Sequence, residues 1–77
     1  MTAKADGWAV INRHNAIEVR TVSPTRRAAI LNWLLTDRGL MATHVATDKL
    51  IERQWELDSA DFCARVARVT IEEVVAS

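Results

Sequence analysis

The stretches Gly7-Trp-Ala-Val-Ile-Asn-Arg13 and Ala16-Ile-Glu-Val-Arg-Thr-Val22 decide the fold, because both alternate apolar and polar residues and only His14-Asn15 separates them. Alternation of this kind is typical of a half-buried β-strand. A two-residue loop also fixes the register of the two strands that it joins. We therefore expect a β-hairpin in which Val10 lies opposite Val19.

The expected register assigns the hairpin side chains to two faces. One face is apolar and carries Trp8, Val10, Ile17 and Val19. The other face is mixed and carries Ala9, Ile11, Arg13, Glu18 and Arg20. A sheet covered by helices on its apolar face explains this pattern, whereas no reaction does.

A first helix is expected from Pro24 to Arg38, with Ser23 as its cap and Gly39 as its stop. Its residues are apolar almost all round. Trp33 lies outside the main apolar arc, so it either packs at the edge of the second helix or is exposed to a partner.

A second helix is expected over 48–57, capped by Thr47. Residues 58–61 then read as a turn. Alternation returns from about Arg65 to Val74 and indicates a third strand. We expect this strand to direct three side chains to the core: Ala67, Val69 and Ile71.

These elements predict an α+β domain of order ββααβ, with a three-stranded sheet and two helices packed on one face. Residues 1–6 are expected to form a flexible N-terminal tail, and residues 7–77 a single domain. The third strand could pair parallel to the first strand or antiparallel to the second. The expected core contains Trp8, Val10, Ile17, Val19, Ile30, Leu31, Leu34, Leu35, Leu50, Ile51, Trp55, Val69 and Ile71.

The composition limits the compartment and the class. The chain has 77 residues, a formal net charge of zero and one cysteine, Cys63, so it cannot form an internal disulfide. No apolar run is long enough to span a bilayer, and residues 1–6 lack the apolar core of a signal peptide. We expect a cytoplasmic protein without a membrane partner.

Candidates for catalysis and metal binding are few. His14 and His44 are read as a hairpin-tip residue and a connector residue, and Cys63 as a small apolar filler. No Cys-x-x-Cys, His-x-x-x-His or glycine-rich phosphate loop is present. We therefore predict no catalytic, cofactor or metal site and no enzyme.

The sequence does not identify a biochemical function. Our leading hypothesis is a small non-catalytic protein-interaction module that binds an unidentified protein partner or a second copy of itself. Tryptophan and arginine are favoured at interfaces, and sheet edges can pair with another chain. The candidate contact residues are Ile11, Arg20, Arg26, Arg27, Trp33 and Arg68.

The alternative hypothesis is a small nucleic-acid-binding protein. Eight of the ten basic residues are arginine, which suits phosphate contacts. This alternative requires one continuous patch made of Arg13, Arg20, Arg26, Arg27 and Arg68, and binding that weakens with salt.

Four segments carry a resemblance: Trp8-Ala-Val10, the run from Arg20 to Trp33, the isolated Trp55, and Arg65-Val-Ala-Arg-Val-Thr-Ile71. In these segments the chain resembles short proteins of unknown function found in phage, prophage and related bacterial genomes. The resemblance implies a non-catalytic accessory protein and no particular activity.

Overall fold

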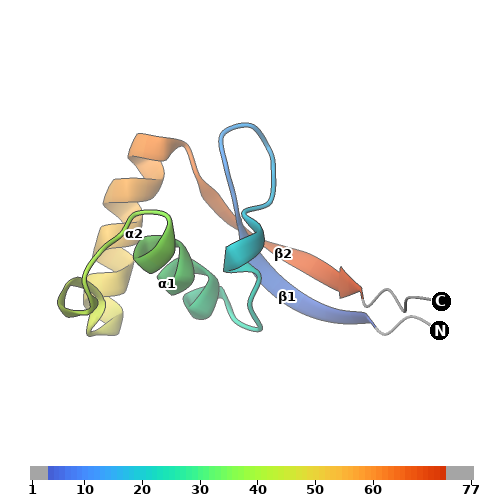
Figure 1. Cartoon of the computed structure of the whole chain (residues 1–77), viewed down its shortest axis with the longest axis horizontal. Helices are drawn as coiled ribbons and strands as arrows, with labels where there is room; N and C mark the ends of the chain where they lie inside the picture. The colour runs from blue at the N-terminus through green and yellow to red at the C-terminus, as the bar shows by residue number, and fades with distance from the viewer. Residues whose placement is uncertain (1–3, 73–77) are drawn as a thin grey trace.

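The computed structural model describes residues 4–72. Two strands form one antiparallel sheet, and two helices pack beside it, so the fold belongs to the α+β class (Figure 1). Strand β1 begins at Lys4, inside the stretch expected as a tail. The elements in chain order are β1 (Lys4–Ile11), the 3-10 helix η1 (Val19–Thr21), α1 (Arg26–Thr36), the 3-10 helix η2 (Ala42–Val45), α2 (Asp48–Phe62) and β2 (Arg65–Glu72).

The predicted three-stranded sheet is wrong, because residues 16–22 do not form a strand. They run along β1 as an irregular connector held by two isolated bridges, Ile11 to Ile17 and Trp8 to Ser23. Between these bridges the connector takes six steps while β1 takes three, and η1 accommodates the difference. The expected pairing of Val10 with Val19 is therefore also wrong.

Asn12 explains why the loop is longer than predicted. Its Oδ1 accepts hydrogen bonds from the backbone N–H of His14 (2.9 Å) and of Ala16 (3.1 Å). The backbone N–H of Asn12 also donates to the carbonyl of Ala16, at 2.9 Å. Asn15 takes the left-handed conformation, with φ of 62°, which asparagine tolerates better than most residues. The loop thus closes between Asn12 and Ala16 rather than across two residues.

Thr21 explains why the connector coils where a strand was expected. Its Oγ1 accepts the backbone N–H of Val10 at 2.8 Å and donates to the carbonyl of Glu18 at 2.6 Å. The hydroxyl thereby satisfies a donor of β1 that a strand partner would satisfy with its carbonyl. Thr21 is fully buried, so this hydrogen bond lies inside the protein.

Helix α1 begins later than predicted, because Thr25 rather than Ser23 caps it. The Thr25 hydroxyl accepts the N–H of Ala28 at 3.1 Å. Ser23 is buried, and its hydroxyl donates to the carbonyl of Thr21 and accepts from the side chain of Asn32, both at 2.9 Å. The helix ends at Thr36, and the chain then reverses through Gly39, whose φ is 66°.

Helix α2 starts as predicted and ends later. The Thr47 hydroxyl accepts the N–H of Leu50 at 3.2 Å. The predicted turn over 58–61 is wrong, because the helix continues through these residues to Phe62. Asp58 is buried inside this last part, where the side chains of Gln54 and Arg38 hydrogen-bond to its carboxylate. A polar residue that suggested a turn is thus a satisfied helix residue.

Strand β2 pairs antiparallel with β1, and neither predicted pairing of the third strand occurs. Val66 lies opposite Val10 and packs against the core. Ala64, just before β2, also packs against the core. Residues that face each other in a ladder share a face, so Ala67 and Val69 point away from the helices. Their predicted direction is wrong, and the side chain of Ile71 lies outside the described residues.

The core lies between β1 and the two helices. Val10, Ile30, Leu34, Ile51 and Trp55 are buried there as predicted, with Leu31 packed against them. Trp8 and Val69 are half-buried. Four predicted core residues are exposed: Ile17, Val19, Leu35 and Leu50. Trp33 and Val45 take their place in the cluster, and Val19 is 80% exposed because η1 turns it outward.

Candidate functional site

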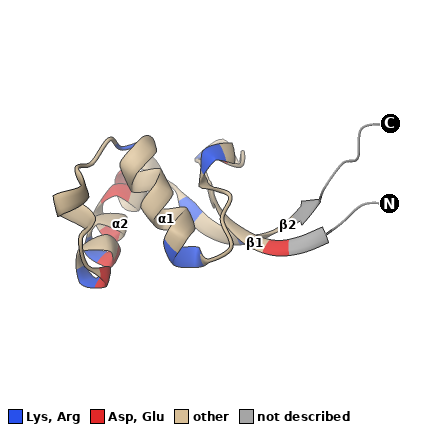
Figure 2. Ribbon diagram, turned by 60° about the horizontal axis from the view of Figure 1, so that its bottom comes forward, with Lys and Arg blue, Asp and Glu red and all other residues tan. Residues whose placement is uncertain are grey.

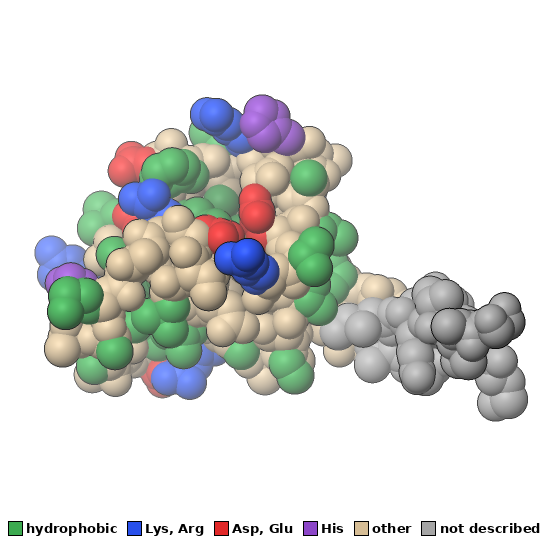
Figure 3. Space-filling model, viewed as in Figure 1, with side chains coloured by type: hydrophobic (Ala, Val, Ile, Leu, Met, Phe, Trp, Pro, Cys, Tyr) green, Lys and Arg blue, Asp and Glu red, His purple; other side chains and the backbone are tan. Residues whose placement is uncertain are grey.

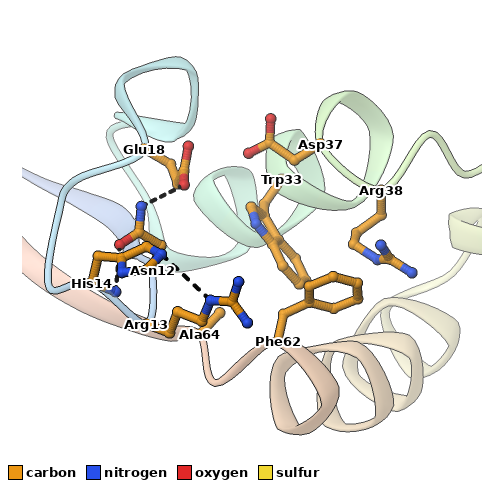
Figure 4. A pocket seen from close by; sticks show the side chains of 9 residues that line it. All are labelled: Asn12, Arg13, His14, Glu18, Trp33, Asp37, Arg38, Phe62 and Ala64. Carbon is orange, nitrogen blue, oxygen red and sulfur yellow. Dashed lines mark hydrogen bonds between the residues drawn. The ribbon is translucent and has the colours of Figure 1, made fainter.

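Three segments that are distant in sequence surround one open cavity of about 320 Å³ (Figure 4). This volume is at the small end of the range typical of ligand sites. The segments are the connector after β1, the end of α1 and the end of α2. Their lining residues are Asn12, Arg13, His14, Glu18, Trp33, Asp37, Arg38, Phe62 and Ala64.

Two aromatic residues form the apolar part of this cavity. Trp33 is 5% exposed and lies edge-on to Phe62, with ring centroids 6.4 Å apart and planes inclined by 76°. Phe62 is at the end of α2 and is exposed. The indole nitrogen of Trp33 is turned toward the wall that carries Glu18 (Figure 4). The cavity therefore combines an aromatic surface with a hydrogen-bond donor.

One wall carries two carboxylates, Glu18 and Asp37. The side-chain amide of Asn12 donates to Glu18 Oε1 at 2.9 Å, so the loop that Asn12 organises also holds Glu18. Asp37 caps the C-terminus of α1, where its backbone N–H donates to the carbonyl of Trp33. Burial and the nearby Glu18 carboxylate raise the pKa of Asp37, against the opposite effect of Arg20.

The positive charges of the lining already have partners. Arg38 contacts Asp58, with its Nε 3.4 Å from Oδ2, and its guanidinium lies 3.9 Å from the centroid of the Phe62 ring. Arg13 is exposed, and its Nε donates to Nε2 of His14 at 3.4 Å. The cationic side of the cavity is thus occupied by contacts within the protein.

The lining contains an imidazole but no hydroxyl or thiol side chain. Cys63 follows Phe62, is exposed, and does not line the cavity. Within residues 4–72, no group of three His, Cys, Asp or Glu side chains could hold a metal ion. The chemistry that the cavity offers is therefore charge pairing, hydrogen bonding and aromatic contact.

The residues proposed from the sequence as contacts lie in different places. Trp33 lines the cavity, whereas Ile11 is buried at the end of β1. Arg20 lies on η1, near enough to Asp37 to lower its pKa. Because Trp33 is buried, packed against Trp55 and Phe62, the edge-packed alternative describes it and the exposed one does not.

The remaining arginines pair with carboxylates. Arg26 contacts Glu52 at 2.8 Å, and Arg27 contacts Asp48, so both bridge α1 to α2. Arg68 contacts Asp6 at 3.4 Å and lies over the Trp8 ring. Acidic and basic residues are accordingly interleaved along α2 in Figure 2. Charge pairing of this kind argues against the continuous arginine patch that nucleic-acid binding requires.

Sequence reasoning missed four residues that shape the cavity: Asn12, Glu18, Asp37 and Phe62. Glu18 was assigned to a strand, and Phe62 was placed beyond the end of the second helix. The pair of asparagines at 12 and 15 was the available signal, because asparagine commonly closes loops through its side chain.

Comparison of the chain with protein families, with curated proteins and with solved structures gives no match. Neither α1 nor α2 combines the length and the apolar composition that a membrane-crossing helix needs.

Proposed function

We propose that this chain is a non-catalytic protein-interaction module whose cavity binds an arginine or lysine side chain of a protein partner. The observation that carries this proposal is the pair of carboxylates, Glu18 and Asp37, on one wall beside the Trp33 ring. A cation placed between two carboxylates compensates their mutual repulsion. An aromatic ring beside it adds a cation–π contribution.

The charges of the lining favour a basic ligand over an acidic one. Arg38 is paired with Asp58 and stacked on Phe62, whereas Arg13 is exposed and makes only a 3.4 Å hydrogen bond with the His14 imidazole. An acidic ligand would have to compete with these contacts. The Asp37 carboxylate, in contrast, is disfavoured by burial and by Glu18, which raise its pKa. A basic side chain would relieve this cost.

The surface supports a local site rather than a broad apolar interface. On the face drawn in Figure 3, hydrophobic side chains lie in separate groups among charged ones. The large exposed apolar side chains also come from different elements, for example Val19 of η1, Met41 before η2 and Leu57 of α2. A scattered arrangement of this kind is ordinary for a protein surface.

Two further statements belong to this proposal. The cytoplasm is the expected compartment, because the single Cys63 cannot form an internal disulfide. The resemblance to phage and prophage proteins predicts an accessory role of the phage type, which is compatible with a non-catalytic module.

Nuclear magnetic resonance with capped tripeptides tests the proposal. We expect Ala-Arg-Ala to shift the Trp33 indole N–H and the backbone amides of Glu18 and Asp37 in a saturable way. Replacing the arginine by citrulline removes the charge at nearly constant shape, so we expect its binding to be much weaker. Equal shifts with the two peptides, or none with the arginine peptide at millimolar concentration, would contradict the proposal.

The variant Asp37→Asn tests whether the arginine peptide binds in the cavity, because Asp37 is one of the lining residues. Because Asp37 is an exposed residue whose carboxylate is only partly desolvated, we expect Asp37→Asn to weaken arginine-peptide binding by only roughly 2- to 5-fold, as for other solvent-screened ion pairs. The matched control is Asp61→Asn, which removes one negative charge from an exposed position of α2 outside the cavity lining. This control should bind the peptide as the unaltered chain does.

A further inference from the structure

The outer edge of β2 is free in the part of the chain that the structure describes. The sheet has the order β1-β2, and the connector over 16–23 covers the other edge of β1. Beyond the helices the two strands continue side by side as a two-stranded ribbon (Figure 1). A two-stranded ribbon is only marginally stable in water, and an unpaired edge is a template for another strand.

The hydrogen bonds of β1 establish which backbone groups of β2 face outward. Trp8 exchanges two backbone hydrogen bonds with Ser23, so its N–H and C=O point away from β2. Along a strand, the N–H and C=O groups of successive residues point alternately to the two edges. Two residues that face each other in an antiparallel ladder therefore point these groups either toward each other or both outward. Because Arg68 lies opposite Trp8, its N–H and C=O point to the free edge, and those of Thr70 do the same.

This edge lacks two of the features that normally prevent strand pairing, namely proline and a bulge. Its sequence contains no proline or glycine, and its register with β1 is continuous over all eight residues. Charged side chains often protect edges. Here the two arginines are exposed but contact groups of their own chain, Arg65 with Asn15 at 2.7 Å and Arg68 with Asp6 at 3.4 Å.

We propose that the free edge of β2 pairs antiparallel with β2 of a second copy of this chain, about a two-fold axis at Val69. The axis is perpendicular to the sheet, so side chains that face each other must lie on the same face. This condition is met only when the axis lies between two copies of the same residue. With Val69 at the axis, Arg68 of one copy and Thr70 of the other exchange their outward-facing N–H and C=O groups.

Strand overlap and charge placement together favour this register, because an axis at Val69 pairs residues 66–72 with one another, all within β2. An axis at Arg68 would set two guanidinium groups opposite each other, which destabilises a strand pair. With the axis at Val69, each Arg68 faces a threonine instead. Thr70 lies opposite Asp6 in its own sheet, so this carboxylate is the next side chain along the row. Strands are about 4.8 Å apart, so this carboxylate lies two strand spacings, roughly 10 Å, from the Arg68 backbone, on the side opposite to the Asp6 of its own chain.

The expected dimer is reversible. Pairing of two strands buries less surface than the roughly 1,600 Å² of a standard interface, so its population should depend on concentration. The resulting four-stranded sheet would have the order β1-β2-β2-β1. This inference does not rest on the cavity, whose lining residues lie elsewhere.

Sedimentation of three proteins across micromolar to millimolar concentration tests the inference. We expect the unaltered chain to change from monomer to dimer. Thr70→Pro removes an N–H that points only to the free edge, so this variant should stay monomeric with an unchanged thermal melt. The matched control Thr70→Val keeps the N–H and should dimerise. A monomeric unaltered chain at millimolar concentration, or a Thr70→Pro variant that dimerises equally, would overturn the inference.

Amide hydrogen exchange of the unaltered chain provides a second readout that needs no variant. The N–H groups of Arg68 and Thr70 should become protected as concentration rises. Those of Ala67 and Val69 point to β1 and should be protected at every concentration. Exchange at Arg68 and Thr70 that does not change with concentration would refute the pairing even if Thr70→Pro failed to fold. Thr70→Pro should also bind the arginine peptide normally, which separates this test from that of the cavity.

Discussion

The indole of Trp33 packs edge-on against the indole of Trp55, with ring centroids 5.4 Å apart and planes inclined by 82°. Edge-to-face pairs of this kind add stabilisation beyond the area that they bury. The contact joins α1 to α2 and sets the position of the aromatic surface that the cavity uses. Stability and the proposed binding therefore depend on the same side chain.

Replacement of Trp33 by alanine should lower the free energy of unfolding by about 3–5 kcal/mol, because a buried aromatic side chain is lost and a void remains. Trp33→Phe keeps a ring against Trp55 and should lower it by less. Urea unfolding followed by circular dichroism measures both. A loss of unfolding free energy below about 1 kcal/mol for Trp33→Ala would contradict the packing, because replacement of a buried aromatic residue by alanine ordinarily costs several kcal/mol.

Replacement of Thr21 by valine should leave the N–H of Val10 buried without an acceptor. The expected cost is about 1–3 kcal/mol of unfolding free energy, the penalty for an unsatisfied buried group. Thr21→Ser keeps the hydroxyl and is the control, so it should lose less. Denaturant titration distinguishes the two, and a valine variant as stable as the unaltered chain would contradict this role of Thr21.

Asp37 should make stability depend on pH. Its folded-state pKa is raised, by burial first and by Glu18 second. A raised pKa means that the contribution of Asp37 to stability is fully present below the unfolded pKa and is lost as pH rises through the folded pKa. At pH 7, well above the ordinary pKa of aspartate, the Asp37→Asn variant should therefore melt at a higher temperature than the unaltered chain.

The difference between these two proteins should disappear in acid, where the Asp37 carboxyl is neutral in both folded and unfolded chains. Glu18→Gln removes the second cause of the shift and should narrow the pH range of the effect. Thermal melts at closely spaced pH values provide the measurement. Parallel melting curves for Asp37→Asn and the unaltered chain at all pH values would show that Asp37 titrates normally.

Asp58 and Arg38 should be coupled. Arg38→Met keeps the length of the side chain but leaves the buried Asp58 carboxylate with Gln54 alone. We expect a loss of about 1.5–3 kcal/mol of unfolding free energy, the range for hydrogen bonds to charged groups. In the double variant with Asp58→Leu the loss should be smaller than the sum of the two single losses. Additive losses would mean that the pair does not interact.

The sequence predicted the elements whose signals are local. Thr47 caps α2 as expected, because a threonine before an aspartate and an apolar run is a helix start wherever it lies. The core positions Ile30, Leu34, Ile51 and Trp55 follow from helical spacing in the same way. The α+β class is correct for these reasons.

The errors arose where a side chain replaced a backbone partner. Residues 16–22 alternate as a strand does, but the hydroxyl of Thr21 takes the N–H of Val10 and lets the connector coil. Nothing in the alternation reveals this exchange. The connector lies along one edge of β1 and β2 pairs antiparallel with the other, in a register that directs Val66 rather than Ala67 and Val69 to the core.

The cavity could not be predicted for a related reason. Glu18 and Asp37 line the same cavity only because the connector coils and α1 ends at Thr36. Phe62 joins them because α2 runs past Asp58, whose burial depends on Arg38 from another element. Contacts between elements determine each of these positions, and a pattern within one element does not contain them.

The pairing of β1 with β2 has a consequence for the order of folding. Ile11 pairs with Arg65, and Lys4 pairs with Glu72, so the ladder joins residues that have both helices between them in the sequence. Contacts so distant in sequence slow folding, because a long loop must close before they form. During synthesis both helices are made before β2, and β1 remains without its partner until β2 has left the ribosome. A polypeptide interrupted after α2 would thus expose the edge of β1 that β2 covers.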